Sequence, residues 1–167
     1  MIVSGHTFLL LAFFSAYSFC YAQEHSGSEK SHKAEGAWEI VFSGLYFFEP
    51  GSEASEESIW GNELHLTYWF NHHWALGVGY TLKYEEAGER GHEVALIGSY
   101  KPVKWITING GPNFTPGTEE ESLSVSAYIE SELNFFIGDH FHLGPVIGGL
   151  LGEHAEIFSG LHLGYEF

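Results

Sequence analysis

The sequence predicts an all-β fold, namely an eight-stranded antiparallel up-and-down transmembrane β-barrel. From residue 37 onward the chain repeats alternating segments of about ten residues, and turn signals separate them. Large apolar side chains occupy one set of alternate positions, and small or polar side chains occupy the other. Every apolar run in this part is shorter than the ~20 residues that a membrane helix needs. We therefore expect residues 37–167 to form the barrel domain.

The residues before the barrel are predicted to be an export signal and a leader. Residues 1–22 have an apolar core, and Cys20 and Ala22 are small residues placed before a secretory cleavage site. No Lys or Arg precedes the apolar core, and a single-pass anchor is the alternative, although the run is short for a spanning helix. Residues 23–36 contain no aromatic or β-branched residue, which predicts a flexible periplasmic leader.

The composition excludes several classes of function. The net charge is −16, with 6 Lys and Arg against 22 Asp and Glu, whereas phosphate binding needs clustered cations. A nucleic-acid partner is therefore not expected. If Cys20 leaves with the signal peptide, the mature chain has no cysteine. Disulfides, thiolate metal ligands and cysteine nucleophiles are then excluded together.

Each alternating segment is expected to form one strand. In chain order they are residues 38–48, 64–70, 74–84, 94–100, 105–113, 123–133, 141–151 and 157–167. The first segment has large apolar residues on both faces, so its inner face predicts an apolar layer inside the barrel. These inner residues are Val41, Leu45 and Phe47.

The third segment indicates which face meets lipid. Between its large residues lie Ala75, Gly77, Gly79, Thr81 and Lys83. In a soluble barrel this second face would be wet and charged, and glycine weakens a strand. Small side chains are instead suited to the narrow interior of an eight-stranded barrel. The large residues then face outward, which is the pattern of a transmembrane barrel.

The fifth and seventh segments fit the alternation less well. In the fifth segment, either Ile106 and Ile108 or Trp105 and Thr107 face outward. The glycines at 110–111 suggest a bulge, which would allow the phase of the alternation to change within the segment. The seventh contains Pro145, which cannot donate to a strand ladder and predicts another bulge.

Short turns and aromatic residues distinguish the two ends of the predicted barrel. Residues 71–73, 101–104 and 137–140 are expected to be tight turns on the periplasmic side, to which an even strand count also returns both termini. The aromatic belt at this end consists of Trp38, Phe70, Trp74, Tyr100, Trp105, Phe136, Phe141 and Tyr165. A sparser girdle at the other end consists of Phe48, Trp60, Tyr84, Phe114 and Phe158.

Two stretches resemble a known family. Leu161, Leu163, Tyr165 and Phe167 resemble the C-terminal strand signature of bacterial outer-membrane proteins, which the barrel-assembly machinery recognises. Residues 68–80, YWFNHHWALGVGY, resemble the strand–turn–strand of small barrels of the OmpA/OmpX type. The resemblance covers residues 37–167 as a pattern. It implies location in the cell outer membrane of a Gram-negative bacterium, with outer-membrane lipid, lipopolysaccharide and the assembly machinery as partners.

The predicted interior is rich in ionisable residues. Those that face it are Glu39, Glu63, His65, Lys83, Glu93, Glu130, Glu132, His142, His162 and Glu166. We expect Lys83, the one cation in this set besides histidine, to pair with Glu93. Glu39 and Glu166 are expected at the periplasmic mouth, together with Glu130, Glu132 and His142, because the first and last strands are neighbours. Crowded carboxylates need compensation by shared protons, charged histidines or a bound divalent cation. The spacing matches no metal motif, so a hydrated network without a cofactor is favoured.

The remaining polar residues do not indicate catalysis. Ser159 and His162 fall on opposite faces of one strand, and the His-x-Ser-Asn motif of outer-membrane deacylases is absent. Acidic loops are expected to form a solvated rim, or to bind lipopolysaccharide phosphates through divalent cations. Their acids are Glu49, Glu53, Glu56, Glu57, Glu85, Glu86, Glu89, Glu119, Glu120, Glu121, Glu153 and Glu156. The sequence favours a non-enzymatic structural or envelope-interaction role. A narrow pore or cation-binding transporter is the first alternative, and a lipid-modifying enzyme is the second.

Overall fold

The computed structural model describes residues 36–48, 50, 59–84, 90–117, 123–152 and 155–167. Its strands are β1 (Ala37–Phe48), β2 (Ile59–Trp69), β3 (Trp74–Tyr84), β4 (Arg90–Val103), β5 (Ile106–Thr115), β6 (Ser124–Leu133), β7 (Phe135–Ile137), β8 (Phe141–Leu151) and β9 (Ala155–Glu166). The predicted signal peptide, nearly all of the predicted leader and the loop acids other than Glu156 lie outside the described residues. Within the described part, no helix is long and apolar enough to cross a membrane.

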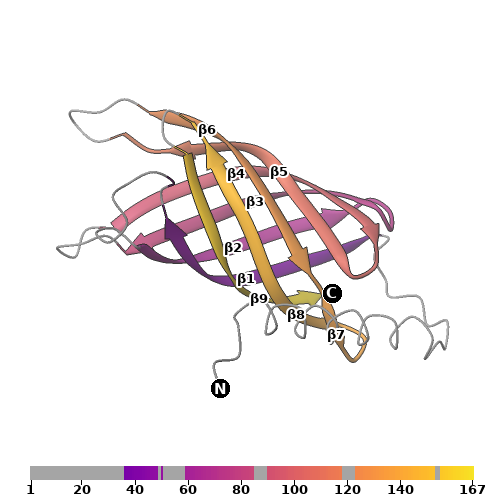
Figure 1. Cartoon of the computed structure of the whole chain (residues 1–167). Helices are drawn as coiled ribbons and strands as arrows, with labels where there is room; N and C mark the ends of the chain where they lie inside the picture. The colour runs from indigo at the N-terminus through magenta and orange to yellow at the C-terminus, as the bar shows by residue number, and fades with distance from the viewer. Residues whose placement is uncertain (1–35, 49, 51–58, 85–89, 118–122, 153–154) are drawn as a thin grey trace, which may run out of the picture. The chain divides into compact units, whose positions relative to one another are not determined.

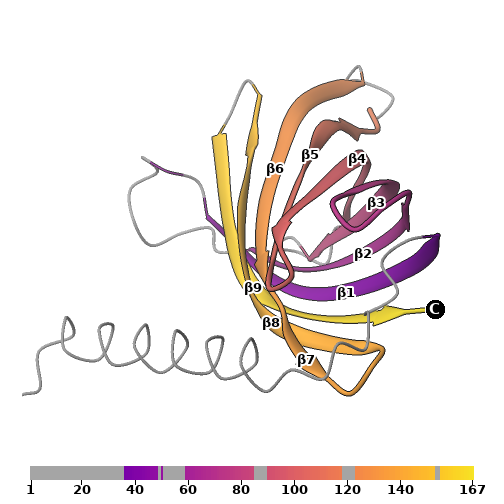
Figure 2. The same ribbon diagram turned by 90° about the vertical axis from the view of Figure 1, so that its right-hand side faces the viewer.

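The strands form one closed antiparallel sheet. Consecutive strands pair from β1 to β6 and from β7 to β9, while β1 pairs with β9 and β6 pairs with β8. Since β6 and β7 are two parts of one strand interrupted at Asn134, the barrel has eight strands. The strands wind round a common axis in Figures 1 and 2. The predicted fold class is therefore confirmed.

The alternation of the sequence becomes the two faces of the barrel wall. On β3, the outward Trp74, Leu76 and Val78 are 55%, 59% and 48% exposed, whereas Ala75 between them is 3% exposed. A strand presents alternate side chains to opposite faces, so the same distribution recurs along the other strands. The large residues thus form an apolar outer surface, and the small and polar residues line the interior.

An apolar layer lies inside the barrel near the end opposite the short turns. Leu45 and Phe47 of β1 belong to it, as the sequence predicted, whereas Val41 is buried inside the barrel but is not part of this layer. Its other members are Tyr128, Val146, Leu150 and Phe158. The Phe158 ring stacks on Tyr128 with ring centroids 5.9 Å apart. The prediction that Phe158 belongs to the second girdle was wrong, because this residue is in phase with the inward His162 and Glu166 on β9.

The bulge predicted at residues 110–111 is absent. The pairs Ala95↔Asn113 and Ser99↔Asn109 share one register, so β5 runs without an extra residue, and Ile108 faces outward. The irregularity lies instead in β4, between Tyr100 and Val103, and it includes Pro102, which has no N–H for the ladder. As a consequence β4 continues into the predicted turn and ends at Val103.

The bulge predicted at Pro145 is also absent. Pro145 stays in register with Leu161 of β9. On its other side, Glu132↔Val146 and Phe135↔Leu143 have the same register, and the ladder is interrupted only between these two pairs. The missing proline N–H therefore breaks the partner strand into β6 and β7 without inserting a residue.

The short turns and the C terminus lie at one end of the barrel (Figure 1). In the turn between β2 and β3, the Asn71 side-chain oxygen accepts hydrogen bonds from the backbone N–H groups of His73 and Trp74, at 2.8 and 3.0 Å. Gly138, in the turn between β7 and β8, has a φ of +69°, a conformation that favours glycine. Exposed rings meet at this end, where Trp74 and Tyr100 have centroids 4.5 Å apart.

Candidate functional site

The barrel interior contains the candidate site. All ten ionisable residues that the sequence placed inside are buried, and Lys101 joins them. The buried Glu, Lys and His side chains of the described residues number six, two and three, respectively. Lys101 was predicted to lie in a turn, but β4 continues through this residue and its side chain points inward. These residues form three groups along the barrel axis.

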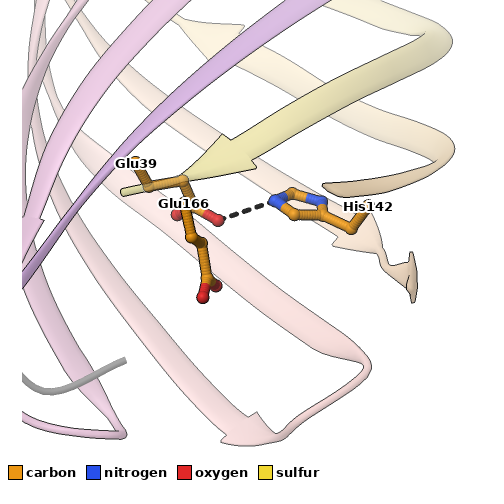
Figure 3. A group of neighbouring side chains, drawn as sticks. All are labelled: Glu39, His142 and Glu166. Carbon is orange, nitrogen blue, oxygen red and sulfur yellow. Dashed lines mark hydrogen bonds and ion pairs between the residues drawn. The ribbon is translucent and has the colours of Figure 1, made fainter. Parts of the chain in front are cut away.

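The turn-end cluster lies beside the short turns. It consists of Glu39, Lys101, His142, His162 and Glu166. The Glu39 carboxylate accepts a hydrogen bond from Trp69 Nε1 at 2.7 Å and lies 2.7 Å from His142 Nε2. Figure 3 shows the His142 imidazole approaching Glu39, with Glu166 beside them on β9. The predicted proximity of Glu39, His142 and Glu166 at this end is therefore present.

Lys101 supplies the positive charge of the turn-end cluster. Its Nζ donates to Glu166 Oε1 at 3.2 Å and lies 4.1 Å from the centre of the Trp69 ring. Polar contacts extend this cluster to Asn134. His142 Nδ1 lies 3.3 Å from His162 Nε2, and His162 Nε2 lies 3.1 Å from Asn134 Oδ1. Each carboxylate here thus has a cationic or hydrogen-bonding partner.

The central cluster lies deeper in the barrel. It consists of Glu63, His65, Glu130 and Glu132. His65 Nε2 is 3.2 Å from Glu63 Oε1, and Thr81 donates to the same oxygen at 3.0 Å. The Tyr128 hydroxyl is 3.2 Å from His65 Nε2, so the phenol lies between this cluster and the apolar layer. The strand pairing sets this depth, since Glu63 and His65 lie opposite the middle of β3.

The two glutamates of β6 share one donor in the central cluster. Asn109 Nδ2 is 2.9 Å from an oxygen of Glu130 and 2.9 Å from an oxygen of Glu132. His65 Nδ1 is 3.9 Å from the same two oxygens. Glu130 and Glu132 were expected at the same end as Glu39 and His142. Both lie in the half of β6 nearer the 137–140 turn, and both lie close to Asn109 and His65.

The Lys83 cluster lies towards the opposite end. It consists of Lys83, Glu93 and Glu156. Lys83 Nζ is 2.7 Å from Glu93 Oε1, which confirms the predicted pair. Lys83 also forms an ion pair with Glu156, which the sequence analysis assigned to a loop but which belongs to β9. Asn113 donates a further hydrogen bond to Glu93 at 3.2 Å.

Ser159 and His162 do not form a catalytic pair. Ser159 lies on the exposed face of β9, whereas His162 is buried inside the barrel. A hydrolytic serine needs a base within hydrogen-bonding distance. The barrel wall separates these two side chains, as the alternation of the strand predicted.

Comparisons with solved structures find small membrane barrels. The N-terminal β-barrel domain of Pseudomonas aeruginosa OprF matches with a TM-score of 0.60 and 16% identity, covering 80% of this chain and 98% of that chain. Ail, the attachment invasion locus protein of Yersinia pestis, matches with a TM-score of 0.55 and 16% identity, covering 80% and 99%. A barrel from the de novo design of transmembrane β-barrels matches with a TM-score of 0.52 and 13% identity, covering 80% and 97%.

The searches by sequence found no counterpart, since neither a protein-family model nor a curated protein matches the chain. At such low identity the structural similarity shows the fold. The chain is structurally similar to the small eight-stranded barrels of outer-membrane proteins, as its sequence pattern indicated.

Proposed function

We propose that this chain is an integral barrel of the cell outer membrane with a non-enzymatic structural or envelope-interaction role. The observation that carries the proposal is the apolar layer formed by residues of β1, β6, β8 and β9 inside the barrel. Water and ions cross a narrow barrel only along a polar path, and an eight-stranded barrel has room for little besides its own side chains. An interior filled in this way favours an anchor over a channel.

The proposed partners follow from the outer surface. Its exposed Leu, Val, Ile and aromatic side chains are suited to contact with outer-membrane lipid and the acyl chains of lipopolysaccharide. Leu161, Leu163 and Tyr165 face outward on β9, and Phe167 follows them, so this stretch is accessible to the barrel-assembly machinery. An N-terminal export signal within residues 1–22 completes the proposed route to that membrane.

Conductance across a planar bilayer tests the role. We expect no steady current steps from the wild-type chain. We expect steps from a Phe47→Ala/Phe158→Ala double variant, because these two large rings of the layer pack side by side on the neighbouring strands β1 and β9, with centroids 5.4 Å apart. Phe42→Ala is the matched control, since Phe42 is exposed on the outer surface and its removal leaves the layer intact. Steady steps from the wild-type chain would contradict the proposal.

A narrow cation pathway is the second candidate. It is favoured by the six buried glutamates, which outnumber the two buried lysines among the described residues. If it is correct, the wild-type chain conducts with cation selectivity, and neutralising Glu63 and Glu130 together reduces that selectivity. A lipid-modifying activity is disfavoured by the separation of Ser159 and His162, and mass analysis of lipid A from an expressing strain tests it.

A further inference from the structure

We infer that the central cluster binds one divalent cation of the Zn²⁺ class through Glu63, His65 and Glu130. This inference goes beyond the proposed structural role and does not depend on it, because a filled barrel with or without conductance can hold a buried ion. Three independent features of the structure carry it: the positions of the donor atoms, an unpartnered carboxylate oxygen and the charge of the cluster.

The donor atoms are already close to one another. One carboxylate oxygen each from Glu63 and Glu130 and one ring nitrogen of His65 all lie within 4.8 Å of one another. Bond lengths of about 2.1 Å place two ligands of a tetrahedral zinc ion about 3.4 Å apart. The 3.2 Å between His65 Nε2 and Glu63 Oε1 is near that spacing. The Glu130 donor lies within 4.8 Å of the other two, so its side chain must move closer for one ion to bind all three.

The unpartnered oxygen is Glu130 Oε2. Among the buried side-chain nitrogen and oxygen atoms of the described residues, three lack a hydrogen-bond partner. Glu130 Oε2 is the only carboxylate oxygen of the three. Glu130 itself is 1% exposed. A buried carboxylate oxygen without a donor is costly, whereas a metal ion replaces the missing donors. The other oxygen of Glu130 accepts from Asn109 and holds the carboxylate in place, as ligand-orienting partners do.

The charge of the central cluster differs from that of the other two. It has three glutamates and one histidine, whereas Lys101 bonds to Glu166 in the turn-end cluster and Lys83 bonds to Glu93 and Glu156 in its own. A neutral histidine that ligates a dication leaves the cluster with one net negative charge when all three carboxylates are ionised. A protonated histidine without the dication leaves two. Of these two states, the one with the dication leaves the smaller net charge.

The chemistry of the donors selects the kind of ion. Mg²⁺ and Ca²⁺ prefer oxygen ligands and larger coordination numbers, whereas an imidazole with carboxylates suits Zn²⁺. The Glu39, His142 and Glu166 group also has donors within 4.8 Å of one another. We assign the ion to the central cluster instead, because Trp69 and Lys101 already donate to the carboxylates of the turn-end group, whereas Glu130 Oε2 in the central cluster has no donor.

Zinc titration of the refolded full chain tests the site. The chain and its variants are refolded in detergent with EDTA, transferred to chelator-free buffer and refolded again with increasing Zn²⁺, so that a buried site can load. We expect one equivalent per folded chain above the background of the urea-unfolded chain. We expect Glu130→Gln to weaken that binding at least tenfold, and Mg²⁺ at the same concentration not to compete.

Glu166→Gln is the matched control, because it makes the same change in the turn-end cluster and should leave zinc affinity unchanged. If Glu130→Gln does not fold, His65→Gln and the visible absorption spectrum of Co²⁺ in the wild-type chain replace it. A Co²⁺ spectrum typical of low-coordinate nitrogen and oxygen ligation supports the site. No saturable zinc, binding that survives Glu130→Gln and His65→Gln, or an equal loss in Glu166→Gln overturns it.

Discussion

Replacing Lys101 by methionine removes the cation of the turn-end cluster while keeping an unbranched side chain of similar length. Lys101 is 5% exposed, donates to Glu166 Oε1 at 3.2 Å and lies over the Trp69 ring. The substitution leaves Glu166 buried beside Glu39 without a lysine to balance them. The packing of the aliphatic stem is retained, so the change isolates the charge.

The expected cost is dominated by the uncompensated carboxylate. Removing one partner of a buried ion pair costs about 3–5 kcal/mol. Loss of the contact between Lys101 and the Trp69 ring adds about 0.5–2 kcal/mol. We therefore expect the free energy of unfolding to fall by about 3 kcal/mol or more.

Urea unfolding in lipid vesicles measures the change, with the gel mobility of unboiled samples reporting the folded fraction. Lys104→Met is the control, because Lys104 is exposed at the neighbouring turn and loses the same charge. Lys101→Arg should recover most of the stability, since it restores the cation. If Lys101→Met costs no more than Lys104→Met, Lys101 does not compensate the cluster and the reasoning is refuted.

Three further perturbations test other parts of the barrel. Val78→Arg, on the outer face near the middle of β3, should cost about 2–4 kcal/mol in vesicles because it places a charge in lipid, and no loss would mean that this face does not contact lipid. Gly164→Ala should lower the free energy of unfolding by about 1–3 kcal/mol, since a Cβ there would clash with the His142 ring and displace the ring from Glu39. Urea unfolding measures this loss, and unchanged stability would show that the ring has room to move. Phe167→Ala should reduce the heat-modifiable fraction recovered from cell membranes without preventing refolding in detergent, and an unchanged fraction would contradict its role as part of an assembly signal.

The alternation of the sequence was sufficient to predict which side of each strand faces inward. On β3 this follows from physical size, because Gly77 and Gly79 leave space in a narrow interior and the large residues beside them must then point out. The same phase placed the polar residues of β2, β6 and β9 inside. A local pattern determines this outcome, since strand geometry alone sends neighbouring side chains to opposite faces.

Features that depend on neighbouring strands were not predictable in the same way. Lys101 appeared to belong to a turn because Pro102 follows it, but pairing with β5 extends β4 through a register shift. Pro145 appeared to require a bulge, yet the ladder is interrupted in the partner strand instead. The hydrogen bonds from Asn109 to Glu130 and Glu132 depend on how β5 pairs with β6, which the alternation within one strand does not show.

The three interior clusters show how the sequence compensates its buried acids. At the turn end and at the opposite end, each group contains a lysine on β4 or β3 whose Nζ lies within 3.2 Å of a glutamate oxygen. Between them, the central cluster has His65 as its one basic side chain for three glutamates, and Glu130 Oε2 has no donor. If neutralising the buried carboxylates were the only requirement, a third lysine at this position would be sufficient. The uneven compensation is therefore the feature that distinguishes this interior from a uniformly neutralised one, and it is the reason to expect a ligand at the centre.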